Sequence, residues 1–245
     1  MQIVVSGISV KIIKKNIKNM HLYVKPPNGN VEVSAPMTMT DESISLFVRT
    51  KLGWIRKQQS KFANQERQSV REYVSGETLY LFGKQYYLQV VHTSPKNSVT
   101  LEGEKAILNV RKNSTTEQRS AFVNEWYREQ LKKQVSILLP KWEKLTGLYA
   151  SSWQIKYMTT RWGTCNTATK KIWLNLQLAK KPIDCLEYVI LHELAHIKVR
   201  NHGEDFVNIM NLYMPYWREI RKKLNDLKLD YMESDDYAND RTSIR

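Results

Sequence analysis

The chain has 245 residues, and lysine and arginine outnumber aspartate and glutamate by 38 to 24, which gives a formal net charge of +14. Hydrophobic residues make up 42% and aromatic residues 10% of the chain, a composition that excludes disorder throughout. With two cysteines and no apolar run of about 18 residues, the sequence supports neither a disulfide framework nor a membrane span. We expect a cytoplasmic, folded protein whose charge suits either a polyanionic partner or simply a soluble surface.

The first 115 residues are predicted to form a β-rich N-terminal domain with one helical insertion. Thr40 is a capping residue, and apolar residues at helical spacing follow it, which predicts a helix from 40 toward 67. No internal repeat is visible in the sequence. Strands and hairpins are predicted where β-branched and aromatic residues lie between turn residues, at 2–13, 20–25, 31–33, 79–91, 97–102 and 105–110.

A second domain is expected over residues 116–230, followed by a flexible acidic tail over 231–245. Helical spacing predicts a helix over 117–139 that ends at Pro140. The first 115 residues contain 17 basic and 8 acidic residues, whereas the remainder contains 21 and 16. The N-terminal domain is therefore the candidate contact for nucleic acid.

Residues 191–196 contain the pattern His-Glu-x-x-His in an amphipathic segment that opens near Pro182. A helix places His192 and His196 one turn apart on one face, so both imidazoles can bind one Zn²⁺ ion. Glu193 then lies beside the open coordination position, where it can accept a proton from an activated water. The alternative is a helix with two surface histidines.

His202 is the candidate third metal ligand. On a continuous helix it would point away from the other two histidines, so the helix must end before it. Asn201 and Gly203 tolerate the left-handed conformation that ends helices, and a new helix is predicted to begin at 203–205. The chain can then return His202 to the metal; the alternative is an exposed histidine in a turn.

Four segments together carry a resemblance to a known family: 161–165 (RWGTC), 173–175 (WLN), 188–196 (YVILHELAH) and 201–206 (NHGEDF). In order and spacing they resemble the YgjP-like metallopeptidase family, relatives of the SprT and WLM zincins. The family pattern usually has serine where Thr164 and Gly203 stand, and tryptophan in place of Val207. These departures leave the three candidate ligands in place.

Residues 161–176 are predicted to form a hairpin beside the metal helix, and the resemblance implies that it borders a cleft for extended substrate. We assign Arg161, Trp162 and Asn175 as candidate substrate-binding residues. Arg161 could hold a phosphate or an oxyanion, and a structural role is equally compatible. Asn175 could polarise the substrate or close the hairpin, and Cys165 is expected to be a buried thiol.

Together these patterns predict an α+β fold in which the β-rich domain is followed by a zincin-like catalytic domain. The predicted function is that of a zinc-dependent hydrolase, most simply a metallopeptidase acting on peptides or proteins. Some members of the family it resembles are associated with hydrolysis of nucleoside triphosphates to monophosphate and pyrophosphate, and the net charge would suit such a UTP-type substrate. The remaining alternative is a nucleic-acid-associated accessory protein with a mainly structural metal site. Glu193 argues against it, because a structural site has no use for a base.

Overall fold

The computed structural model describes residues 1–25, 28–63, 71–92, 96–158 and 161–227. The chain divides between residues 68 and 69 into two compact units, each with a hydrophobic core of its own. None of the described helices is both long and apolar enough to cross a membrane. The acidic tail predicted over 231–245 lies outside the described residues.

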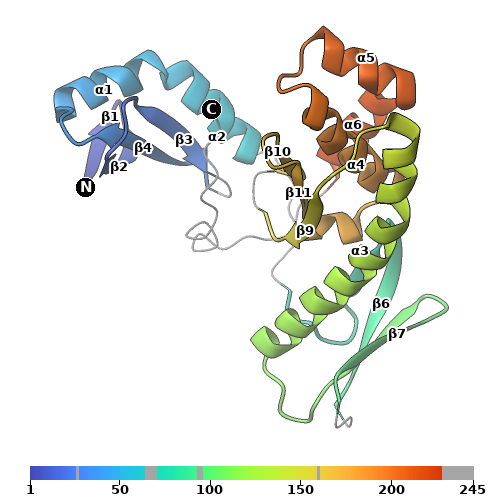
Figure 1. The fold of residues 1–245 in the computed structure, drawn as a ribbon. Coiled ribbons are helices and arrows are strands. Elements are labelled where there is room, and N and C mark those ends of the chain that lie inside the picture. Colours follow the sequence, from blue (N-terminus) through green and yellow to red (C-terminus); the bar gives the residue numbers. More distant parts are fainter. Residues whose placement is uncertain (26–27, 64–70, 93–95, 159–160, 228–245) are drawn as a thin grey trace. The chain divides into compact units, whose positions relative to one another are not determined.

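The first unit is a four-stranded sheet with two helices along one face (Figure 1). Its elements are β1 (Gln2–Val5), β2 (Ile8–Lys15), β3 (His21–Lys25), β4 (Asn30–Pro36), α1 (Asp41–Thr50) and α2 (Leu52–Ala63). The strand order is β1-β2-β4-β3, in which β2 and β4 are parallel and the other neighbours antiparallel. Ile44, Val48 and Ile55 of the helices are fully buried against the apolar face of this sheet.

The predicted helix from residue 40 toward 67 differs in the structure. It starts as expected, because the Thr40 side chain accepts a hydrogen bond from the N–H of Ser43. It is broken at Lys51, whose backbone leaves the helical conformation, and α2 resumes at Leu52. The break lets α1 pack against β1 and α2 against β3 on the twisted sheet. The end of the prediction, at 64–67, lies outside the described residues.

The second unit begins with β5 (Thr78–Leu81), β6 (Lys84–Val91), β7 (Ser98–Glu102), β8 (Lys105–Asn109) and the long α3 (Thr116–Thr146). The strand order β5-β6-β8-β7 and the parallel pairing of β6 with β8 repeat the arrangement of the first unit. Both first hairpins turn through two residues at positive φ, Ser6-Gly7 and Phe82-Gly83. Both following helices start at a threonine cap.

Strand registers show that the chain contains one structural module twice, although no repeat is visible in the sequence. When the two hairpins are aligned, four buried residues of the first sheet fall on buried residues of the second, whereas buried Val31 falls on exposed Glu104. The sequence does not reveal this repeat, because the matched positions keep apolar character and not identity. The matched buried pairs are Val10 with Tyr86, Ile12 with Leu88, Val33 with Ala106 and Ala35 with Leu108.

The domain boundary predicted at 115 lies inside the second unit. Leu88 and Leu108 of the second sheet belong to the same hydrophobic core as Val123 and Leu131 of α3. The sheet of β5–β8 and the helix that follows it therefore fold as one body. The division comes earlier, at residues 68 and 69.

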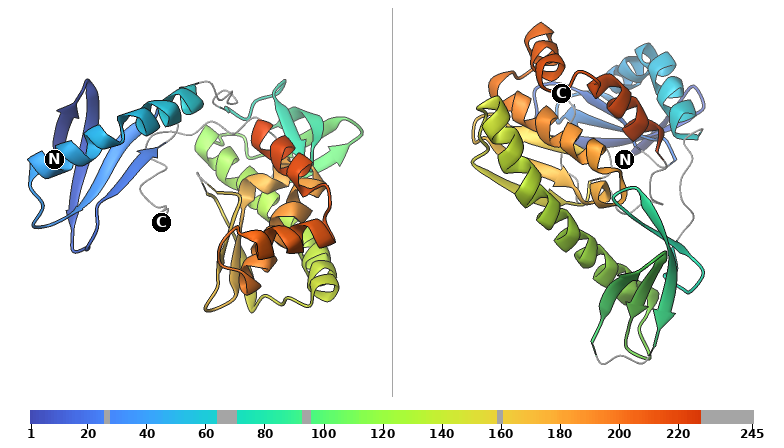
Figure 2. Two further views of the ribbon diagram at one scale, coloured as in Figure 1. Left: turned by 90° about the horizontal axis from the view of Figure 1, so that it is seen from above. Right: turned by 90° about the vertical axis from the view of Figure 1, so that its right-hand side faces the viewer.

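The rest of the second unit surrounds α4, the helix predicted to bind metal (Figure 2). Its elements are β9 (Ser152–Lys156), β10 (Gly163–Asn166), β11 (Lys171–Asn175), the 3₁₀ helix η1 (Leu176–Lys180), α4 (Ile183–Lys198), α5 (Glu204–Tyr213) and α6 (Trp217–Asp226). The strand order β10-β11-β9 leaves β10 at an edge, and α4 packs against it. The α+β fold class is as predicted.

The end predicted for α3 at Pro140 is wrong. The helix continues through this proline to Thr146, and Gly147 ends it in the left-handed conformation. Proline lacks the N–H of a helical hydrogen bond, but Leu139 and Trp142 on either side of it are buried in the main core. Their packing outweighs the lost bond.

Candidate metal centre

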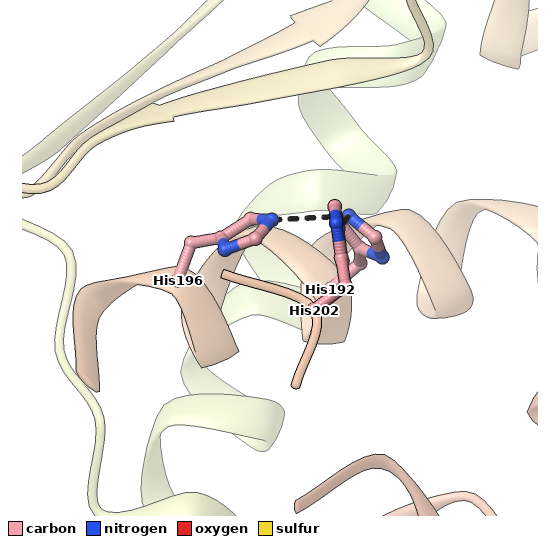
Figure 3. A group of neighbouring side chains, drawn as sticks. All are labelled: His192, His196 and His202. Carbon is pink, nitrogen blue, oxygen red and sulfur yellow. Dashed lines mark hydrogen bonds between the residues drawn. The ribbon is translucent and has the colours of Figure 1, made fainter. Parts of the chain in front are cut away.

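Three histidines from two segments converge at the end of α4 (Figure 3). His192 and His196 lie one turn apart on α4, and His202 comes from the connection to α5. The Nε2 atom of His192 lies 3.2 Å from that of His196 and 3.1 Å from that of His202. The structure thus brings together the three residues that the sequence singles out.

The cluster fits a tetrahedral metal ion in both spacing and chemistry. Nitrogens about 2.05 Å from a tetrahedral zinc ion lie about 3.3 Å from one another, close to the observed spacings. Imidazole binds metal in its neutral form, and burial together with the neighbouring histidines lowers the pKa of His192 to about 3. Three nitrogen ligands leave one tetrahedral position open, which is typical of catalytic and not of structural zinc sites.

Groups behind the histidines fix the orientation of the rings. Nδ1 of His196 lies 3.0 Å from the carbonyl oxygen of Val199, and Nδ1 of His192 lies 3.4 Å from the hydroxyl of Tyr188. In both rings Nδ1 is therefore engaged and Nε2 faces the cluster. Phe206, fully buried in the first turn of α5, has its ring centre within 5.1 Å of all three imidazoles.

The chain break that places His202 differs in detail from the prediction. The structure ends α4 at Val199, in the extended conformation that β-branched residues favour (φ −127°, ψ 117°). Gly203 does not adopt a left-handed conformation, and Asn201 is not among the non-glycine residues at positive φ. Gly203 instead precedes α5, which starts at Glu204 as expected.

Glu193 is the buried acid of the centre, with 4% of its surface exposed. Burial raises the pKa of its carboxyl to about 8, and the charge of Arg161 acts in the opposite direction. Gly163 of β10 makes room for it, since a Cβ at this position would lie 2.6 Å from Oε1 of Glu193. The contact joins the strand to the metal helix.

The three candidate substrate residues are placed differently from one another. Arg161 lies near Glu193, as its electrostatic effect on that carboxyl shows, and Trp162 is half-buried beside the ammonium of Lys181, 5.8 Å from its ring centre. Asn175 is buried, and its amide nitrogen donates to the carbonyl oxygens of Met158 and Arg161, each at 2.7 Å. These bonds join Asn175 to residues that precede β10, a structural role different from closing the hairpin, and its predicted contact with substrate stays a prediction.

Cys165 of β10 is half-buried, whereas a buried thiol was expected. Burial, and secondly the charge of Glu193, raises its pKa to about 11. The protonated thiol is a weak nucleophile and a poor metal ligand at neutral pH.

Comparison with known proteins identifies the family of the chain. A helix that holds two histidines and an acid, with a third histidine after the helix end, defines a metal-dependent hydrolase. Residues 18–227 match the family model described as the YgjP-like metallopeptidase domain, and the chain therefore belongs to this family. No curated protein matches it.

Two solved structures are similar to parts of the chain. The metallopeptidase zymogen jannalysin of Methanocaldococcus jannaschii is 27% identical, with a TM-score of 0.34; the match covers 37% of this chain and 92% of that one. The metallopeptidase zymogen abylysin of Pyrococcus abyssi is 19% identical, with a TM-score of 0.36; that match covers 40% and 99%.

Sequence reasoning did not find roles for Gly163, Tyr188 and Phe206. All three stand in the segments that carry the family resemblance, but their contacts join elements distant in sequence or lie behind the ligands. The one available signal was helical spacing, because Tyr188 precedes His192 by one turn.

Proposed function

We propose that the chain is a zinc-dependent peptidase in which His192, His196 and His202 hold the ion and Glu193 is the general base. The observation that carries this proposal is a buried carboxyl group, that of Glu193, on the same helix as two of three converging imidazole nitrogens. Bound zinc would supply a Lewis acid that polarises the scissile carbonyl and lowers the pKa of the attacking water.

The residues of the chain supply the proton transfers. Glu193 accepts a proton from the attacking water and then donates it to the nitrogen that leaves. Its burial between α4 and Gly163 restricts the carboxylate to few positions, so little reorientation is needed when the water reacts.

The edge strand supports a peptide as the substrate. No described strand pairs with the second edge of β10, and α4 packs against the same strand. An extended peptide can add to such an edge through main-chain hydrogen bonds, with its scissile bond near the residues of α4. A nucleotide would leave these backbone groups unused.

The experiment compares three proteins, each loaded with one equivalent of zinc: the wild type, Glu193→Gln and Glu187→Gln. Glu187 lies on the same helix, but its carboxylate forms an ion pair with Lys141, with an N–O distance of 2.6 Å, and takes no part in the histidine cluster. Glu187→Gln therefore controls for the effect of a Glu-to-Gln substitution on this helix. Casein and a peptide library are the test substrates, with mass-spectrometric detection. We expect Glu193→Gln to keep its zinc and lose about 10²–10⁴-fold in turnover, and Glu187→Gln to cleave normally.

Two further substrates in the same assay decide between the alternatives. Release of pyrophosphate from UTP, abolished by Glu193→Gln and without peptide cleavage, would replace the proposal by nucleotide hydrolysis. Binding of single-stranded DNA with no turnover of any substrate would favour an accessory protein. Equal rates for the wild type and Glu193→Gln would remove the glutamate from the mechanism.

A further inference from the structure

The first sheet has one face that no described element of its own unit covers. Helices α1 and α2 lie along the opposite face, as Figures 1 and 2 show. Val10 and Ile12 of β2 point to the helices and are buried, so alternation places Lys11, Ile13 and Lys15 on the uncovered face. We call this surface the open face.

Strand pairing defines which side chains share the open face. Lys11 of β2 stands opposite Glu32 of β4, which in turn stands opposite Tyr23 of β3. His21 lies two residues before Tyr23 on the same strand, and the two ring centres are 6.5 Å apart. The open face therefore presents two aromatic rings beside exposed lysines.

The charge of the open face is positive. Glu32 is its one acidic residue among the described strands, and Nζ of Lys25 neutralises it at 2.9 Å. Lys11 and Lys15 are exposed. Lys18, also exposed, follows in the loop between β2 and β3. Three ammonium groups thus remain available to an anionic partner.

The repeated module shows that its fold does not require these residues. Strand registers align Lys11 with Tyr87, Lys15 with Val91 and Tyr23 with Glu102 of the second sheet. The sign of the charge is also reversed at one position, since Glu32 aligns with Lys105. Four buried positions match while the open faces differ, so the combination of lysines and rings is particular to the first copy.

We propose that the open face, formed by Lys11, Lys15, His21 and Tyr23, binds single-stranded nucleic acid. Lysine ammonium groups pair with the backbone phosphates, and unpaired bases stack on the imidazole and phenol rings. A duplex offers phosphates but no free base face, and an acidic peptide offers neither the spacing of phosphates nor bases to stack. The proposal is independent of hydrolysis at the metal centre.

Fluorescence anisotropy with the full-length protein tests the proposal, using a labelled 20-nucleotide single-stranded RNA and the matching duplex at about 0.15 M salt. The variant Lys11→Glu/Lys15→Glu reverses two charges on the open face. The matched control, Arg56→Glu/Lys57→Glu, reverses two exposed charges on α2 in the helical layer of the same unit. Tyr23→Leu removes a ring while keeping an apolar side chain.

We expect the wild type to bind the single strand more tightly than the duplex, with affinity falling as salt rises. The Lys11→Glu/Lys15→Glu variant should bind the RNA at least about 10-fold more weakly than the wild type, and Tyr23→Leu roughly 5- to 100-fold more weakly. The control variant on α2 should lose less than about 3-fold in affinity. Circular dichroism of each variant establishes that the sheet has formed. Unchanged affinity of Glu193→Gln for the RNA would separate this surface from the metal centre.

Three results would overturn the proposal: no binding by the wild type, equal losses in the open-face and α2 variants, or a duplex bound as tightly as the single strand with Tyr23→Leu unaffected. The second would indicate a diffuse charge effect. The third would indicate a phosphate surface without stacking.

Discussion

Gly163 lies where β10 passes the carboxylate of Glu193, and the absence of a side chain permits that approach. In Gly163→Ala the new Cβ would meet Oε1 at 2.6 Å and Cγ at 2.8 Å, so the carboxylate must move. We expect zinc to be retained and turnover to fall about 10- to 100-fold, because a misplaced base is inefficient. Gly53→Ala, where a Cβ meets nothing within 4 Å, is the control. Equal activity of both variants would contradict the role assigned to Gly163.

The Tyr188 hydroxyl orients a ligand and does not bind the metal itself. Its oxygen lies 3.4 Å from Nδ1 of His192, and its ring stacks on Trp217. Loss of such a partner behind a histidine ligand costs about 10- to 100-fold in metal affinity, which we expect for Tyr188→Phe in a chelator competition. Tyr216→Phe, at an exposed position, should bind zinc like the wild type. Equal affinities would show that the hydroxyl is dispensable.

At the residue scale, local spacing predicted more than composition could. The separation of His192 and His196 fixes their common face on any helix, and the return of His202 follows from a short break. The contact of Gly163 with Glu193 could not be predicted, because it joins a strand and a helix thirty residues apart in the chain. Such contacts depend on tertiary packing.

The buried side chain of Asn175 bonds backbone groups of the described residues before β10 and at the start of η1. Its amide oxygen accepts from the N–H groups of Met158 and Gln177, and its nitrogen donates to two carbonyl oxygens. In Asn175→Ala these backbone groups lose their partners, so we expect a loss of about 2–4 kcal/mol in the free energy of unfolding. Urea denaturation measures it, with exposed Asn208→Ala expected to stay within about 0.5 kcal/mol. An unchanged free energy of unfolding for Asn175→Ala would show that these hydrogen bonds do not stabilise the fold.

At the scale of elements, start signals were more informative than end signals. Thr40 caps α1 where the sequence indicated, and α3 begins at Thr116, one residue before its predicted start. Pro140 did not end α3, and α4 ended at Val199 without a left-handed residue. Capping is a local hydrogen bond, whereas the end of a helix depends on what its last turns pack against.

At the scale of the whole molecule, two separate cores predict separable stability. Ile44 is fully buried in the core of the first unit, which contains no residue of the metal centre. Ile44→Ala should destabilise that unit by about 2–5 kcal/mol and leave zinc affinity unchanged. Thermal denaturation followed together with zinc release tests this expectation. A parallel loss of zinc would indicate that the two cores unfold as one.

The α+β class was predictable from the whole sequence, but the domain boundary was not. The change in composition near residue 115 falls between a sheet and the helix that packs on it, so it marks a change of element and not of domain. The repeat escaped detection because Val10 corresponds to Tyr86 and Val33 to Ala106, which share burial without similar size. The two sheets share one strand order although their matched residues differ in type.

The most direct test of the metal centre is the zinc content of the purified protein after dialysis against a weak chelator, measured by elemental analysis. We expect about one zinc ion per chain in the wild type. The variants His192→Ala, His196→Ala and His202→Ala should each lose it, because each removes one nitrogen ligand. His92→Ala, an exposed turn histidine outside the cluster, should keep its zinc. Background zinc in the wild type, with no uptake on titration, would contradict the account.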